Sequence, residues 1–255
     1  MKKILVGVVG LPPLPHRFNN TMSMSELIDY SVEEARLLAK GGVDSIIVQN
    51  LHDLPPGVDE QIETAAYMSV LTREIKRVTN GISLGVNVQT ADPRANLAIA
   101  AACECDYVRI KNYVGAVVAT DGIDNGCCSQ AISYRHKINA DQVKIYADVF
   151  DRMSSKLGEK DLGFMVSQAL GYGKADAVII TGSNINESIE MGKIAKSKAG
   201  KKPVLLGGGA NLEDMEKWAR VFDGAIVGIA FREDGYSSKY DPKKIKAFIK
   251  EYRKY

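Results

Sequence analysis

The stretch KPVLLGGGANLEDMEKWARVFDGAIVGIAFRED, residues 202–234, contains two consecutive units in which a short apolar run ends in glycine. The first run is Val204–Leu206, and three glycines follow it. The second run is Ala225–Val227, and Gly228 ends it. Such runs are typical of buried parallel strands that end in a turn. Two of them side by side indicate the last two strands of a (β/α)8 barrel.

Both glycine exits have the properties of an anion site. Glycine lets backbone N–H groups approach an anion closely, and a helix N-terminus, expected here at Asn211, adds favourable dipole charge. The loops after the last two strands of a (β/α)8 enzyme commonly bind phosphate. The sequence therefore predicts a phosphate site formed by Gly207, Gly208, Gly209, Ala210, Gly228, Ile229 and Ala230. The alternative is that the glycines only form tight turns.

Short runs rich in Val and Ile alternate with amphipathic segments along the whole chain. The runs are Ile4–Val9, Ser45–Val48, Ser83–Val88, Tyr107–Ile110, Val143–Ala147, Ala177–Ile180, Val204–Leu206 and Ala225–Val227. The segments with helical spacing are Ser25–Lys40, Glu60–Thr79, Arg94–Cys103, Ser129–Lys137, Leu162–Gly171, Ile185–Lys198, Leu212–Val221 and Pro242–Tyr255. Eight strand–helix units predict a single α/β domain, residues 1–255, folded as a (β/α)8 TIM barrel. The alternative is an open doubly wound sheet, but the first strand lacks its Gly-x-Gly-x-x-Gly turn.

Composition and charge exclude several classes of protein. Hydrophobic residues make up 45% and charged residues 25% of the 255 residues, as in ordinary globular domains. A net charge of +2 argues against binding to nucleic acid or to a membrane surface. The N-terminal apolar run is broken at Pro12 and Pro13, and no run is long enough to span a bilayer. We therefore expect a cytoplasmic protein without a membrane span, and a homo-oligomer, as is common for barrels of this size.

The cysteines do not indicate a metal site. Cys103 and Cys105 form a Cys-x-Cys pair, and Cys127 and Cys128 are adjacent, which is not the usual spacing of zinc ligands. A secreted disulfide scaffold would be shorter and richer in cysteine. We therefore expect free thiols, no metal and no cofactor.

Alternation of side chains along the predicted strands brings polar residues to one end of the barrel. In the fifth strand the apolar residues share the outer face, so Asp148 points inward at the C-terminal end. The same alternation points Asn87 of the third strand, and Arg109 and Lys111 of the fourth, inward. Active sites of (β/α)8 barrels are built at this end.

A buried carboxylate beside two cations suits acid/base chemistry, because each group shifts the proton affinity of the other. We therefore interpret Asp148, Lys111, Arg109 and Asn87 as candidate catalytic residues. Arg109 and Lys111 are suited to hold an anionic substrate or to stabilise developing charge. A structural ion pair that closes the top of the barrel is the alternative.

Two other strand ends supply candidate substrate contacts. Asn50 and Asp53 follow the second strand, and Thr181 and Gly182 follow the sixth. The stretch Gly115–Gly126 is long and rich in glycine. It is interpreted either as a mobile lid over the site or as a surface loop.

The order and spacing of these motifs resemble the BtpA/SgcQ family across nearly the whole chain. The matching stretches are VVGLPPLP, GGVDSIIVQN, LGVNV, YVRIKNYVGA, ISYRHKI, YADV, ADAVIITG, PVLLGGGA and DGAIVGIAFREDG. The family is named for a cyanobacterial factor needed for photosystem I accumulation, and it includes members grouped with sugar-metabolism genes. The resemblance implies a barrel of the ribulose-phosphate-binding type without a settled reaction.

The chain departs from the family pattern at four strand ends. The family tends to have Glu-Asn after the second strand, where this chain has Gln49-Asn50, and Arg-x-Asn after the fourth, where Lys111 replaces the Asn. After the third strand Asn-Val-Leu-Arg-Asn-Asp becomes NVQTAD, residues 87–92, and after the fifth Asp-Val-x-x-Lys-His becomes DVFDRM, residues 148–153. A carboxylate, a histidine and a lysine are therefore lost or replaced, while the phosphate end is kept.

Two functions follow from these observations. The first is an enzyme that acts by acid/base chemistry on a phosphorylated small molecule, a sugar phosphate or a nucleotide. The second is a non-catalytic assembly or regulatory factor, similar to one for photosystem I biogenesis, that retains an anion pocket.

Overall fold

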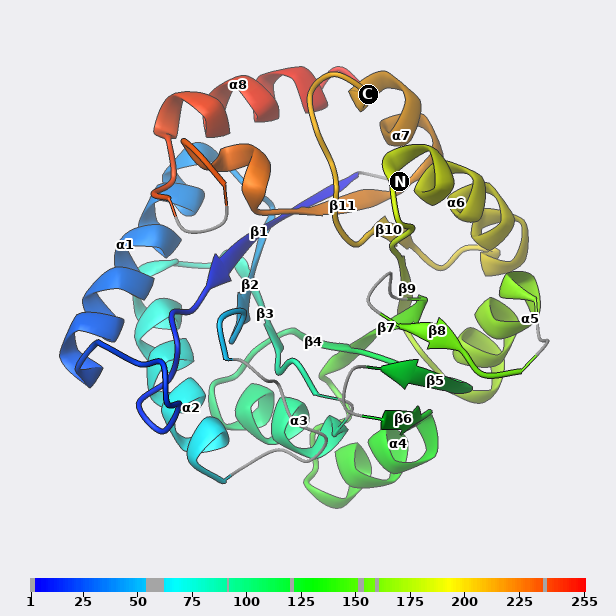
Figure 1. Ribbon diagram of the computed structural model, residues 1–255, viewed down its shortest axis with the longest axis horizontal. Helices are drawn as coiled ribbons and strands as arrows, with labels where there is room; N and C mark the ends of the chain where they lie inside the picture. Colours follow the sequence, from blue (N-terminus) through cyan, green and yellow to red (C-terminus); the bar gives the residue numbers. More distant parts are fainter. Residues whose placement is uncertain are drawn as a thin grey trace.

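The strands of the protein close into a barrel. The computed structural model describes residues 3–53, 62–90, 92–119, 122–150, 154–158, 161–235 and 238–255. Within them, eight parallel strands close in the order β1-β11-β10-β9-β7-β4-β3-β2 (Figure 1). They are β1 Ile4–Gly10, β2 Ser45–Gln49, β3 Ser83–Asn87, β4 Tyr107–Ile110, β7 Lys144–Phe150, β9 Ala177–Ile180, β10 Val204–Leu206 and β11 Gly224–Val227. Each predicted run overlaps one of these strands, so the predicted (β/α)8 barrel is confirmed.

Helices surround the barrel on its outer side (Figure 1). They are α1 Met24–Gly41, α2 Ile62–Val78, α3 Pro93–Ala102, α4 Cys128–Lys137, α5 Leu162–Ser167 with the π-helix Gln168–Tyr172, α6 Ile185–Ala199, α7 Met215–Val221 and α8 Pro242–Tyr252. Local sequence sets their ends. Ser23 and Glu26 form a capping box at the start of α1, and Gly42 ends it with φ 96°, a left-handed conformation that favours glycine. Residues 60 and 61 of the helix predicted over Glu60–Thr79 lie outside the described residues.

The two faces of the barrel strands form two apolar clusters. The outer faces pack under the helices and include Val86, Val108 and Ile145. The inner cluster consists of Val6, Val8, Ile47, Tyr107, Ile179, Leu205 and Ile226. Tyr107 fits inside because Gly85 has no side chain: a Cβ there would lie 2.3 Å from the Tyr107 ring. Since the inner cluster packs the barrel interior, polar side chains gather at the strand ends, as the alternation predicted.

The helix predicted from Asn211 begins later in the structure, as α7 at Met215. The side chain of Asn211 accepts a hydrogen bond from the N–H of Asp214 at 2.7 Å. This is the bond of a helix-capping Asn, but the next one, from the N–H of Met215 to the carbonyl of Leu212 at 3.3 Å, spans only three residues, so a turn precedes the regular helix. The prediction that Asn211 starts a helix is therefore wrong.

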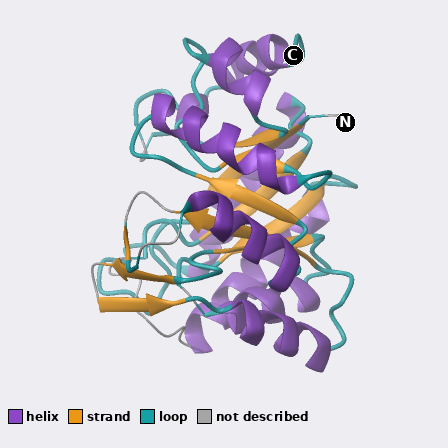
Figure 2. Ribbon diagram, turned by 90° about the vertical axis from the view of Figure 1, so that its right-hand side faces the viewer, coloured by secondary structure: helices purple, strands orange, loops and turns teal. Residues whose placement is uncertain are grey.

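The glycine-rich stretch Gly115–Gly126 is a hairpin rather than an irregular loop. It contains β5 Ala116–Ala119 and β6 Gly122–Asn125, and β5 also pairs with β8, Ser155–Lys156. Figure 2 shows this small antiparallel sheet standing apart from the barrel strands. Residues 120 and 121 of this stretch, and residues 151–153 after β7, lie outside the described residues.

Candidate functional site

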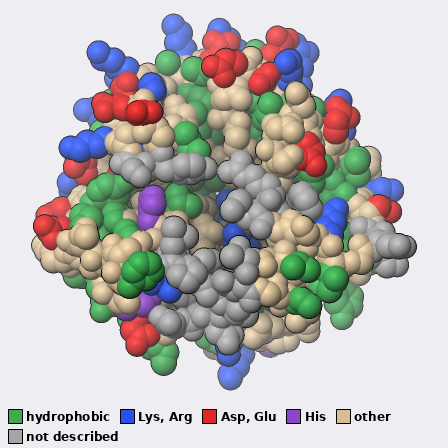
Figure 3. Space-filling view, in the orientation of Figure 1, with side chains coloured by type: hydrophobic (Ala, Val, Ile, Leu, Met, Phe, Trp, Pro, Cys, Tyr) green, Lys and Arg blue, Asp and Glu red, His purple; other side chains and the backbone are tan. Residues whose placement is uncertain are grey.

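A cavity of about 360 Å³ opens at the C-terminal ends of the barrel strands. Figure 3 shows the molecule from the side on which the barrel is hollowed, with basic side chains in its depth. The described residues that line it are Val8, Gln49, Leu51, Gln89, Arg109, Lys111, Thr181, residues 207–211, residues 226–230, Arg232 and Tyr240. Both glycine exits therefore face one space. Of the four candidate catalytic residues, Arg109 and Lys111 line the cavity, whereas Asp148 and Asn87 are buried and are not among its described lining residues.

The three glycines after β10 differ in what surrounds them. A Cβ on Gly207 would lie 2.2 Å from Oγ1 of Thr181, so this position requires glycine for close packing. A Cβ on Gly208 would find its nearest neighbour 3.8 Å away. Gly209 has φ 77°, which favours glycine. Within the described part of the chain, the N–H groups of Gly208, Gly209 and Ala210 have no acceptor, so they can bind an anion in the cavity.

The loop after β11 faces the same space. Gly228 precedes a single 3-10 turn, Ile229–Phe231, in which the N–H of Phe231 donates to the carbonyl of Gly228 at 3.0 Å. Gly228, Ile229 and Ala230 all line the cavity. The sequence predicted that a helix starting at Asn211 would add its dipole to the anion site. That prediction is wrong, because α7 begins only at Met215. Backbone N–H groups of the two loops are the donors on this side.

Arg109 and Asp148 form a two-point ion pair inside the barrel. Nε of Arg109 donates to Oδ2 of Asp148 at 2.7 Å, and Nη2 donates to Oδ1 at 3.0 Å. Nη2 also lies 3.3 Å from the place that a Cβ on Gly207 would take. The guanidinium thus reaches across the barrel to the exit of β10. Because Asp148 is 1% exposed and both its oxygens contact Arg109, the carboxylate orients the guanidinium.

Three polar side chains at or beside the cavity have buried atoms without a hydrogen-bond partner. They are Gln49 at Nε2, Thr181 at Oγ1, and Asn87 at both Nδ2 and Oδ1. Gln49 and Asn87 are direct neighbours across β2 and β3. Buried polar groups are normally hydrogen-bonded. Their arrangement therefore indicates groups that a bound molecule or water can satisfy.

Asn50, Asp53 and Gly182 do not line the cavity. Asn50 donates to Asp53 at 3.1 Å and accepts from the N–H of Gln89 at 2.9 Å. Asp53 also accepts a backbone N–H of the loop after β1 at 2.9 Å and pairs with Arg17 at 3.3 Å. Gly182 donates to a side chain of α6 at 2.9 Å. These contacts hold neighbouring loops together, so substrate contact by the three residues stays a prediction that the geometry does not favour.

Sequence reasoning missed a buried ion pair beside the cavity. Arg232 donates to both carboxylate oxygens of Glu34, at 2.8 and 2.9 Å, and its guanidinium carbon lies 4.1 Å from the centroid of the Tyr240 ring. The hydroxyl of Tyr240 donates to the carbonyl of Val8. Burial raises the pKa of the Glu34 carboxyl, and hydrogen bonds from Arg232 and Tyr30 oppose that rise. The sequence shows Arg232 shortly after the last predicted strand, but nothing in it pairs Arg232 with Glu34, which lies 198 positions away.

The described residues contain no cluster of three His, Cys, Asp or Glu side chains that would hold a metal ion. The four cysteines are free thiols. Burial raises the pKa of both Cys105 and Cys127 to about 12, so these thiols stay protonated and unreactive at neutral pH. No helix among the same described residues is long and apolar enough to cross a membrane.

The closed barrel of eight parallel strands, with its cavity at the C-terminal ends of the strands, defines a (β/α)8 TIM barrel. The fold is similar to that of N-(5'-phosphoribosyl)anthranilate isomerase from Pyrococcus furiosus, with a TM-score of 0.59 and 14% sequence identity. That comparison covers 99% of this chain and 100% of the isomerase. At this identity the likeness concerns the fold alone.

The chain belongs to the BtpA family, whose family model matches residues 1–254. It is 33% identical over 237 residues to an uncharacterized protein of Archaeoglobus fulgidus, covering 92% of this chain and 94% of the relative. It is 30% identical over 250 residues to the photosystem I biogenesis protein BtpA of Synechocystis sp., covering 96% of this chain and 86% of the relative. The membership expected from the sequence motifs is confirmed.

Proposed function

We propose that the cavity binds a phosphorylated small molecule, a sugar phosphate or a nucleotide, and that the protein acts on it by acid/base chemistry. The observation that carries the proposal is the convergence of the two glycine exits on one cavity that Arg109 and Lys111 also line. Backbone N–H groups and cations together form a phosphate site, since charge-assisted hydrogen bonds are stronger than neutral ones. The isomerase with a similar fold has a phosphoribosyl compound in its name, which fits the proposal.

In this proposal the phosphate lies on the loop Gly207–Ala210 and on the loop Gly228–Ala230. Gly208, Gly209 and Ala210 supply N–H groups, and Arg109 lies beside the first glycine. The rest of the ligand extends toward Lys111 and the ends of β2 and β3. Electrostatic stabilisation by Arg109 and Lys111 would act on charge that develops during the reaction.

Asp148 is the proton acceptor of this proposal. Because Arg109 holds both of its oxygens, a ligand must share one of them for a proton to reach the carboxylate. Asn87 lies on the same inward face two strands away, across β4. It supplies a neutral donor and acceptor near the reacting part of the ligand.

The second candidate is a non-catalytic assembly or regulatory factor with the same anion pocket. Two observations favour it: the carboxylate of Asp148 is fully engaged by Arg109, and one relative is named a photosystem I biogenesis protein. Both candidates need an anion in the cavity. They differ in turnover, which a panel of phosphorylated sugars and nucleotides assayed for loss of substrate would detect.

Inorganic phosphate is the direct test of the phosphate site. Isothermal titration is expected to show saturable binding, and crystals soaked in phosphate or sulfate are expected to hold the anion on the two glycine loops. An anion found only elsewhere on the protein would contradict the proposal. Sedimentation in the same buffer tests the homo-oligomer that is expected for barrels of this size.

Gly208→Ala is expected to weaken phosphate binding by roughly tenfold to a hundredfold, the equivalent of one hydrogen bond to a charged group. The added Cβ would have only one neighbour within 4 Å, at 3.8 Å, so the fold should keep its stability while the methyl group obstructs the anion. Isothermal titration and thermal unfolding measure the two effects separately.

Two variants serve as controls for this prediction. Gly171→Ala also adds a Cβ in open space, but in the π-helix, which does not line the cavity, so phosphate affinity should not change. Gly207→Ala would bring a Cβ to 2.2 Å from Thr181 and 2.5 Å from Ile179. It should destabilise the protein by about 1–3 kcal/mol through overpacking. If Gly208→Ala leaves affinity unchanged, the phosphate does not lie on this loop.

A further inference from the structure

Two side chains of the cavity wall each present a buried polar atom that no described residue satisfies. They are Gln49, with Nε2, and Thr181, with Oγ1. The two residues are 4% and 5% exposed. Leaving a buried donor without a partner is unfavourable, and both atoms lie at the one described cavity that contains the phosphate loops.

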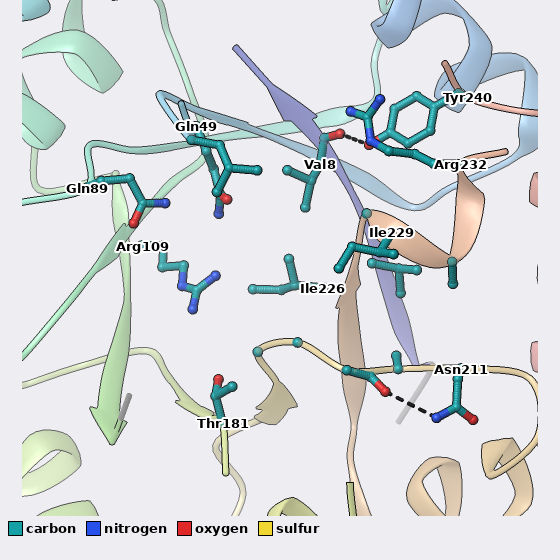
Figure 4. Close-up of a pocket in the computed structure, with 18 of the residues that line it drawn as sticks. Val8, Gln49, Gln89, Arg109, Thr181, Asn211, Ile226, Ile229, Arg232 and Tyr240 are labelled. Carbon is teal, nitrogen blue, oxygen red and sulfur yellow. Dashed lines mark hydrogen bonds between the residues drawn. The ribbon is translucent and has the colours of Figure 1, made fainter. Parts of the chain in front are cut away.

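The two residues face the cavity from different sides. Gln49 ends β2, and Thr181 follows β9 beside the exit of β10. Figure 4 shows Gln49 and Thr181 on opposite sides of the cavity, with the Arg109 side chain between them in this view. Asn87 lies next to Gln49 across the sheet, and both atoms of its amide are unpartnered. A ligand that reaches from the phosphate loop to β2 would pass Thr181 first and the two amides next.

These groups are uncharged, and together they include hydrogen-bond donors and acceptors. The amide of Gln49 donates, the hydroxyl of Thr181 donates or accepts, and the amide of Asn87 does both. Hydroxyl groups also donate and accept, so neighbouring hydroxyls complement this set of atoms. A carboxylate or a second phosphate only accepts, and would leave the acceptor of Asn87 without a donor.

The cavity lacks a platform for a nucleobase among the residues described. Bases bind to proteins largely by stacking on aromatic side chains. Tyr240 is the single aromatic residue among the described lining residues. One face of its ring is covered by the guanidinium of Arg232 at 4.1 Å, and its hydroxyl is bonded to Val8. The walls therefore favour a polyhydroxylated chain or ring over a flat aromatic base.

We propose that Gln49 and Thr181, with Asn87 behind Gln49, form a subsite that binds the hydroxyl groups of the ligand, which is a sugar phosphate rather than a nucleotide. This inference rests on the proposed function, because the phosphate loops place the ligand. It assigns to Gln49 a role that the sequence did not suggest, and to Asn87 a part in binding.

Isothermal titration with four probes tests the subsite: inorganic phosphate, ethyl phosphate, ribose 5-phosphate and adenosine 5'-monophosphate. Ribose 5-phosphate is expected to bind at least about tenfold tighter than ethyl phosphate, since two or more hydrogen bonds are added. Gln49→Leu and Thr181→Val should each weaken ribose 5-phosphate by roughly threefold to tenfold and leave ethyl phosphate unchanged. The nucleotide should bind no tighter than ribose 5-phosphate.

Thermal unfolding separates binding from structure. Both substitutions remove a buried atom without a partner, so the melting temperature of each variant should equal or exceed that of the wild type. Thr72→Val is the matched control: Thr72 on α2 is also buried with an unpartnered hydroxyl but does not line the cavity, so it should affect no ligand.

The outcomes distinguish this inference from the proposed function. If neither inorganic nor ethyl phosphate binds, the proposed function fails and the subsite fails with it. If both bind but ribose 5-phosphate binds no tighter than ethyl phosphate, the phosphate site stands and the subsite is wrong. The same conclusion follows if Gln49→Leu leaves the affinity for ribose 5-phosphate unchanged. Tighter binding of the nucleotide than of ribose 5-phosphate would also overturn the subsite.

Discussion

Asp148→Asn is expected to lower the free energy of unfolding by about 3–5 kcal/mol, the usual loss when one partner is removed from a buried ion pair. Asp148 is 1% exposed and accepts two hydrogen bonds from Arg109. Asn has the same shape but no charge, and its NH2 group would face one of the guanidinium donors. If the protein is an enzyme, turnover should also fall by a factor of about 10²–10⁴, since the proton acceptor is gone.

Urea unfolding of the single and double variants measures the structural effect. Arg109→Met with Asp148→Leu removes both charges, and should recover most of the lost stability, because apolar replacement of a whole buried pair is often neutral or favourable. Full turnover together with a lowered stability would mean that Asp148 is a structural partner of Arg109 and not a catalyst. A variant as stable as the wild type would mean that the pair does not support the barrel.

The alternation of side chains predicted the inner face of the barrel correctly because it depends only on backbone geometry. In β7 and β4, apolar residues such as Ile145 and Val108 pack under the helices, so the residues between them must point inward. Strand order then places Asp148 beside Arg109, since β7 and β4 are neighbours in the barrel. The ion pair followed from these two facts without any knowledge of side-chain conformation.

Local competition limited the prediction outside the strands. Asn211 makes the side-chain bond of a helix cap to Asp214, yet the residues after it form a turn, and the regular helix begins only at Met215. The hairpin β5–β6 is also hidden in the sequence. Its four-residue strands, with glycines at Gly122 and Gly126, are typical of a loop, and only the structure shows β5 paired with both β6 and β8.

The hydroxyl subsite and the Arg232 ion pair were missed for a different reason. Gln49 was noticed only as a departure from the family pattern, and no residue type signals that a buried amide has no partner. Glu34 lies on the buried face of α1, where a carboxylate would not be expected without a partner. That anomaly was the available signal, but identifying Arg232 as the partner requires the closed barrel, which brings α1 next to α8 and to the loop after β11.

Arg232→Met is expected to lower the free energy of unfolding by about 3–5 kcal/mol near neutral pH, because it leaves the carboxylate of Glu34 buried without its cation. Arg232 and Glu34 are each 4% exposed. The substitution also removes the contact with the Tyr240 ring at 4.1 Å. Tyr30 would remain as a hydrogen-bond donor to Glu34, at 3.1 Å, but a neutral hydroxyl replaces only part of the lost stabilisation.

The loss in Arg232→Met should depend on pH in a direction that identifies Glu34. Burial already raises the pKa of this carboxyl above its ordinary value of 4.5, and the hydrogen bonds and charge of Arg232 are the largest effects that oppose the rise. Without them the folded pKa rises further. The folded protein then holds a proton that the unfolded chain has released, so stability falls as pH rises from the unfolded pKa to the folded one, by up to about 1.4 kcal/mol per pH unit.

Urea unfolding should therefore show that Arg232→Met lowers the free energy of unfolding less at about pH 5 than at about pH 8. The control is Arg232→Met combined with Glu34→Gln, which has no carboxyl at this position and should show no added pH dependence. His52 contributes a weak charge effect on Glu34 and is present in both proteins, so it cancels in the comparison. Equal losses at the two pH values would mean that Glu34 is not the group that Arg232 stabilises. The packing of Arg232 on the Tyr240 ring would then account for the stability that Arg232 contributes.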